Sequence, residues 1–135
     1  MSAPPRPRAI VALVAFFAFG TLAGGVAALT LALPGTALDV VWRLKPEEHA
    51  RLATTGALSV LLMCAVSAAC AAAAVGVWRG RRWAWWLAIA LIAANLVGDA
   101  ANAVLRGDLR TLVGLPIGGA LLAWLVFGRA RAWFR

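Results

Sequence analysis

AIVALVAFFAFGTLAGGVAALTLAL, residues Ala9–Leu33, is an apolar run without a single charged residue. Three further long apolar runs follow, at Leu52–Trp78, Trp83–Leu105 and Thr111–Gly128. The hydrocarbon core of a bilayer is roughly 30 Å thick and takes about 20 helical residues to cross. The sequence therefore predicts an all-α integral membrane protein built as a bundle of four transmembrane helices.

The composition of the chain supports the same class. Hydrophobic residues make up 64% of the 135 residues and charged residues only 13%, against about 25% charged in an ordinary soluble domain. We expect a single membrane domain over residues 9–128 with no room for a soluble catalytic domain. Because no catalytic or cofactor motif is present, we expect no enzyme activity, no cofactor and no metal.

The limits of the helices follow from the apolar runs and from the prolines. We expect membrane helices over residues 9–33, 47–78, 83–105 and 109–128, with an outer loop over 34–46 that holds a possible short interfacial helix. The first run is too long for the roughly 7–15 apolar residues of a secretory signal, so it is predicted to be an uncleaved helix. The proline-rich segment 1–8 is predicted to be a disordered tail, and 129–135 a basic tail.

The arginines are distributed unevenly between the two ends of the predicted helices. One end carries only basic residues, and the other carries five basic and all five acidic residues. The basic end is formed by Arg6, Arg8, Arg79, Arg81, Arg82, Arg129, Arg131 and Arg135. The positive-inside rule places this end in the cytoplasm, so both termini are predicted to be cytoplasmic. The lysine-poor, alanine- and arginine-rich composition favours the inner membrane of a bacterium with a GC-rich genome.

Aromatic and basic residues alternate at the second connection. They are predicted to be interfacial anchors, which hold the helix ends at the level of the lipid headgroups. These anchors are Trp78, Arg79, Arg81, Arg82, Trp83, Trp85 and Trp86. Recognition of a specific anionic lipid by the same residues is the alternative. Because the arginines lie at helix ends, nucleic acid is not expected as a partner in spite of the net charge of +8.

Gly20 and Gly24 form a small-residue motif in the first helix. Such motifs allow a second helix to approach closely in a membrane. We expect packing against a helix of the same chain, with homodimerisation as the alternative.

Two groups of residues have side chains capable of metal or redox chemistry. Capping of the helix that begins at Pro46 explains Glu47, Glu48 and His49, and a metal site is the alternative. Cys64 and Cys70 lie about 120° apart around their helix and cannot form a bridge within it. Both are expected to be buried thiols.

The third helix carries the pattern that most resembles a functional site. Asn95, Asp99, Asn102 and Arg106 are spaced 4, 3 and 4 residues apart and share one helical face. With Pro116 of the fourth helix they are predicted to form one polar cluster in the outer half of the membrane. In one interpretation the cluster holds two helices together. In the other, Asp99 binds or carries protons in an outward-facing cavity.

Several motifs taken together resemble a group of small, uncharacterised bacterial membrane proteins. They are Leu44-x-Pro46-x-x-His49, Gly76-Val77-Trp78-Arg79-Gly80-Arg81-Arg82-Trp83, Asn95-Leu96-x-Gly98-Asp99-x-x-Asn102 and Gly107-Asp108-x-Arg110-Thr111-Leu112-x-Gly114-x-Pro116-Ile117. The resemblance covers residues 44–125 and implies a four-helix bundle without a known activity. It also implies that Asn95, Asp99, Asn102 and Pro116 belong to one motif.

The predicted function is that of a non-enzymatic membrane component with a structural or accessory role. Its expected partners are the lipid bilayer and a larger membrane complex or further copies of the chain. The alternative is a small oligomeric transporter or channel that uses Asp99.

Overall fold

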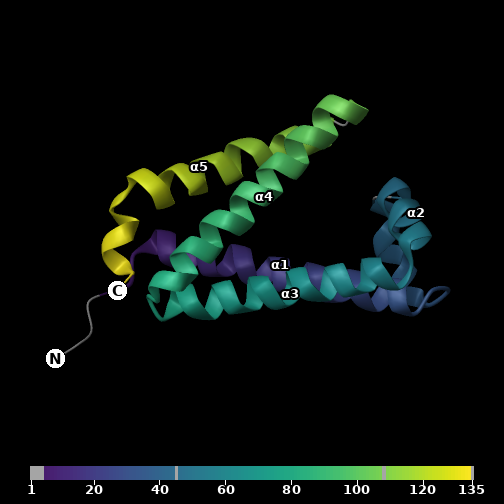
Figure 1. The fold of residues 1–135 in the computed structure, drawn as a ribbon, viewed down its shortest axis with the longest axis horizontal. Coiled ribbons are helices and arrows are strands. Elements are labelled where there is room, and N and C mark those ends of the chain that lie inside the picture. Colours follow the sequence, from purple (N-terminus) through teal and green to yellow (C-terminus); the bar gives the residue numbers. More distant parts are fainter. Residues whose placement is uncertain (1–4, 45, 108, 135) are drawn as a thin grey trace. The chain divides into compact units, whose positions relative to one another are not determined.

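A computed structural model describes residues 5–44, 46–107 and 109–134, and all the regular elements within these ranges are helices (Figure 1). Four of them are long and apolar enough to cross a membrane. They are α1 (Arg8–Ala32), α3 (Ala57–Trp78), α4 (Arg82–Arg106) and the segment Leu109–Phe127, in which α5 (Gly114–Phe127) follows the 3-10 helix η2 (Leu109–Val113). The prediction of an all-helical chain with four long apolar helices is confirmed.

The chain divides into two compact units, which are described separately. The terminal unit comprises Met1–Ala15 and Ala72–Arg135, and the middle unit comprises Phe16–Ala71. Helices α1 and α3 each contribute residues to both units.

In the middle unit, the connection between α1 and α3 is itself helical. The 3-10 helix η1 (Ala37–Leu44) is followed by α2 (Pro46–Thr55). Asp39 accepts a hydrogen bond from the Gly35 backbone N–H at 2.8 Å, which closes the turn after α1. Phe17 and Thr30 of α1 are almost fully buried, as is Ser59 of α3.

The single helix predicted over residues 47–78 is wrong, because Gly56 divides it into α2 and α3. Gly56 has a φ of +57°, a left-handed conformation that costs glycine little. The hydroxyl groups of Thr54 and Thr55 donate to the Arg51 carbonyl at 2.6 and 3.1 Å. Such side-chain bonds compete with the helical hydrogen bonds of the backbone, so α2 ends at Thr55.

In the terminal unit, a tight turn joins α3 to α4. The Arg81 N–H donates to the Gly76 carbonyl and the Gly80 N–H to the Val77 carbonyl, at 2.9 and 3.1 Å. With Gly80 at a φ of +67°, this is a Schellman motif, which ends a helix and satisfies its last carbonyls. The buried core of this unit includes Ile10, Leu13, Ile92 and Leu125.

Helices α4 and α5 lie side by side within the terminal unit (Figure 1). Pro116 does not interrupt a single long α-helix. Pro116 lies in the first turn of α5, and the preceding residues form η2. The first backbone N–H groups of an α-helix have no partner within the helix, so a proline there removes no hydrogen bond.

The two predicted tails differ from expectation where the structure describes them. Arg8 already belongs to α1, and residues 1–4 of the predicted disordered tail lie outside the described residues. Most of the predicted basic tail forms the 3-10 helix η3 (Arg129–Trp133). Ala130 and Phe134 are 3% and 7% exposed, so burial of their apolar side chains orders this segment.

Candidate functional site

The predicted polar cluster brings together Asp99 of α4 and the start of α5. The Asn95 side-chain amide donates to Asp99 Oδ2 at 3.3 Å. A Cβ atom added at Gly114 would lie 3.0 Å from the same oxygen. Asp99 is half-buried. Its carboxylate therefore lies against the first residue of α5 and bonds to its own helix.

One turn further along α5, a second glycine keeps the two helices close. A Cβ atom added at Gly118 would lie 2.8 Å from Leu96 Cδ2. Gly118 is buried, whereas Gly119 has nothing within 4 Å of such an atom. Gly114 and Gly118 thus form the face of α5 that meets α4, as small residues do at helix contacts in membranes.

The other predicted members of the cluster have different surroundings. Asn102 is half-buried, and Arg106 is the exposed last residue of α4. Pro116 lines an apolar groove with Ala9 and Ala12 of α1 and with Leu121 and Trp124 of α5. Asn95 and Asp99 share one face of α4 and are hydrogen-bonded, but their spacing in the sequence does not indicate which residue of the fourth helix faces the carboxylate.

In the middle unit, the small-residue motif of α1 faces α3. A Cβ atom added at Gly24 would lie 3.2–3.3 Å from Ser67, including its backbone, and one added at Gly20 would lie 3.1 Å from Cys70 Sγ. The Ser67 hydroxyl donates to the Thr21 carbonyl at 2.8 Å. The motif therefore serves a contact within the chain.

Only one of the two cysteines is buried, which corrects the expectation of two buried thiols. Cys70 lies against Gly20 and is buried, whereas Cys64 is exposed, and both are free thiols. The reason is their angular separation around α3, since six helical residues place them on different faces. Only the face of Cys70 meets α1.

Trp42 holds the connection between α1 and α3 in place. Its indole N–H donates to the Thr30 hydroxyl at 2.7 Å. The ring of His49 stacks on the indole at 5.0 Å between centroids and 26° between planes. Among the described residues, no group of three or more His, Cys, Asp or Glu side chains could hold a metal ion. His49 thus packs on an aromatic ring in this structure.

The predicted interfacial anchors gather around the α3–α4 turn together with the C-terminal segment. The Trp85 indole N–H donates to the Leu125 carbonyl at 3.0 Å, and the Trp133 indole N–H donates to the Val77 carbonyl at 3.0 Å. The Arg6 guanidinium lies 3.8 Å above the Trp78 ring. Two of the indole N–H groups thus join separate helical segments of the terminal unit.

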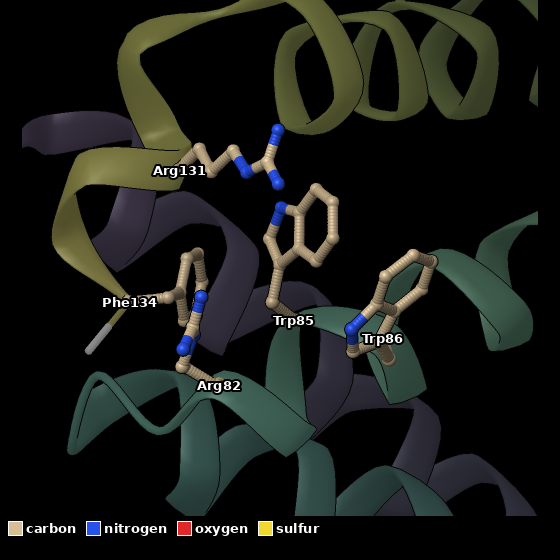
Figure 2. A pocket seen from close by; sticks show the side chains of 5 residues that line it. All are labelled: Arg82, Trp85, Trp86, Arg131 and Phe134. Carbon is tan, nitrogen blue, oxygen red and sulfur yellow. The ribbon is translucent and has the colours of Figure 1, made fainter.

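A pocket of about 270 Å³ opens at this end of the terminal unit (Figure 2). Its lining residues are Arg82, Trp85, Trp86, Arg131 and Phe134. Sequence reasoning missed Arg131 and Phe134, because the C-terminal residues were predicted to be a tail. The aromatic pair Trp133-Phe134 after the arginines is the sequence signal that indicates a folded segment.

Comparison of the chain with protein-family models, with curated proteins and with solved structures finds no match. The resemblance to small bacterial membrane proteins therefore stays a prediction.

Proposed function

We propose that the chain is a non-enzymatic, multi-pass protein of the bacterial inner membrane with a structural or accessory role. Its described surface supports a lipid environment, because large apolar side chains project from the long helices. Phe19, Val104 and Phe127 are 72%, 83% and 88% exposed. Soluble monomers rarely expose large apolar patches, whereas lipid-facing positions of membrane helices are apolar.

In this proposal both termini lie in the cytoplasm. The turn between α3 and α4 and the segment η3 carry arginines and no acidic residue, as the cytoplasmic side of a membrane protein does. Reporter fusions at residue 1 and residue 135 test the orientation. Both fusions are expected to be active with a cytoplasmic reporter and inactive with a periplasmic one.

The observation that carries the structural role is the position of Asp99. A carboxylate inside a membrane helix is costly and is expected to face protein or water. Here it accepts a hydrogen bond from Asn95 and lies against Gly114 at the start of α5. The carboxylate is thus bonded within α4 and packed against the start of α5, which supports a structural role for Asp99 at the contact of the two helices.

Reconstitution of the purified protein separates the structural role from transport. Liposomes that contain the wild-type chain are expected to show no more proton or solute flux than liposomes that contain Asp99→Asn. Co-purification of a second membrane protein in fixed stoichiometry, retained in Asp99→Asn, would support an accessory subunit. A flux that the wild type supports and Asp99→Asn abolishes would overturn the structural role and favour a transporter.

A further inference from the structure

The pocket at the α3–α4 turn is built from two separate parts of the terminal unit. Figure 2 shows Arg131 and Phe134 projecting from the C-terminal segment toward Arg82 and Trp85 at the start of α4. The Arg131 guanidinium lies 5.3 Å from the centre of the Trp85 ring. Two cationic side chains thus line one hollow whose remaining walls are aromatic.

The C-terminal segment is held against the α3–α4 turn, which keeps Arg131 at the pocket that Arg82 also lines. The Trp133 N–H bonds to the Val77 carbonyl. A Cβ atom added at Gly80 would lie 2.8 Å from the Trp133 carbonyl oxygen. Because Gly80 lacks this atom, η3 can rest directly on the turn. Phe134 is buried beside it.

Among the described residues of the terminal unit, only Asp99 has an acidic side chain. The segments 50–98 and 109–135 contain no Asp or Glu. Asp99 lies about 25 Å along α4 from Arg82, at the rise of about 1.5 Å per residue of an α-helix. No side chain caps the start of α4, and its first turn holds no acidic residue. The positive end of the helix dipole therefore adds to the charge of the arginines.

We propose that this pocket binds a phosphate group, namely the headgroup phosphate of an anionic membrane lipid. Guanidinium groups bind phosphate oxygens through paired charge-assisted hydrogen bonds, and here Arg82 and Arg131 approach from different segments. The volume of about 270 Å³ is several times the roughly 30 Å³ that one water molecule occupies in the liquid. A phosphate ester therefore fits.

The aromatic residues favour a lipid over a free phosphate ion. Trp86 lines the pocket and is 65% exposed, so its ring can contact the glycerol and upper acyl carbons of a lipid. Tryptophan is typical of the depth at which headgroups meet acyl chains. The identification of the lipid rests on the proposed membrane placement, whereas the affinity for phosphate does not.

Lipid binding to the purified protein in uncharged detergent tests the site. Retention of phosphatidylglycerol, phosphatidylcholine and inorganic phosphate is measured by native mass spectrometry and by tryptophan fluorescence. The wild type is expected to retain phosphatidylglycerol about tenfold more tightly than either of the other two. Phosphatidylcholine carries a choline cation that the arginines repel and that cancels the charge of its phosphate, and inorganic phosphate has no acyl chains to contact Trp86.

Two double variants of equal charge separate a built site from general attraction of anions. Arg82→Gln with Arg131→Gln removes both guanidinium groups of the pocket. Arg79→Gln with Arg129→Gln removes one arginine of the α3–α4 turn and one of η3, neither of which lines the pocket. The first pair is expected to weaken phosphatidylglycerol binding about tenfold more than the second.

Equal losses in the two double variants would overturn the proposal, as would a wild type that retains phosphatidylcholine equally well. Inorganic phosphate bound as tightly as phosphatidylglycerol would overturn the lipid as the ligand. If the first double variant does not fold, the single variant Arg82→Gln is used in its place, because it leaves the contact of Arg131 with Trp85 intact. Since the assay is done in detergent, its result is independent of the orientation that the reporter fusions measure.

Discussion

The carboxylate of Asp99 lies so close to Gly114 that a Cβ atom at residue 114 would stand 3.0 Å from Oδ2. The two residues belong to different helices, α4 and α5. Asn95 bonds to the same oxygen. The first residue of α5 is therefore a glycine at a point where α5 meets the half-buried Asp99, and the carboxylate leaves little room for a side chain at residue 114.

The first prediction concerns alanine substitutions in α5. Glycine to alanine at a free helical position stabilises a helix by about 1 kcal/mol. Gly119→Ala is expected to show this gain, because its Cβ atom would meet nothing within 4 Å. Gly114→Ala is expected not to show this stabilisation, because the new methyl group would displace the Asp99 carboxylate. Thermal unfolding in detergent measures both variants, and equal midpoints would contradict the proposed contact.

The second prediction concerns the small-residue motif of α1. Gly24→Ala forces a methyl group against the backbone of Ser67, which lies 3.3 Å from the added atom. Overpacking of this kind costs about 1–3 kcal/mol. Gly25→Ala is the matched control, since its methyl group would meet only the Ser67 hydroxyl at 3.6 Å.

The free energy of unfolding in a titration with denaturing detergent measures both variants. Gly24→Ala is expected to be the less stable of the two by more than 1 kcal/mol. An equal loss of stability in both variants would contradict the prediction, because it would show that α1 tolerates no added methyl group here, whether or not the residue faces Ser67.

The four long helices could be predicted from the sequence, because apolar length alone sets whether a helix matches a bilayer. The division at Gly56 could not. It depends on the hydroxyl groups of Thr54 and Thr55 bonding to Arg51, and such local competition does not change the hydropathy pattern.

The candidate sites could be predicted only in part, for a related reason. Helical spacing identifies residues that share a face, as for Asn95 and Asp99, but it does not give the register of the neighbouring helix. The contact of Gly114 with Asp99 and the place of Arg131 in the pocket are therefore seen only in the folded chain. The C-terminal segment folds because Trp133 and Phe134 have partners distant in sequence, and no periodicity indicates those partners.

The third prediction concerns Trp42. Trp42→Phe keeps an aromatic ring against His49 but removes the N–H that bonds to the Thr30 hydroxyl at 2.7 Å. The loss of one such bond is expected to cost about 1 kcal/mol. Hydrogen exchange is expected to accelerate in η1. Trp86→Phe is the control, because the Trp86 ring is 65% exposed, and equal acceleration in η1 in both variants would contradict the role of the bond.

The last prediction concerns Trp133, whose N–H joins the C-terminal segment to the carbonyl of Val77. Trp133→Phe removes this bond, so η3 is expected to open more often and to expose its backbone. The loss of a hydrogen bond that contributes about 1 kcal/mol raises the population of the open segment about fivefold. Trypsin cleavage after Arg129 and Arg131 is therefore expected to accelerate by that factor, with Trp86→Phe as the control. Unchanged cleavage in Trp133→Phe would show that the packing of Ala130 and Phe134 alone holds the segment.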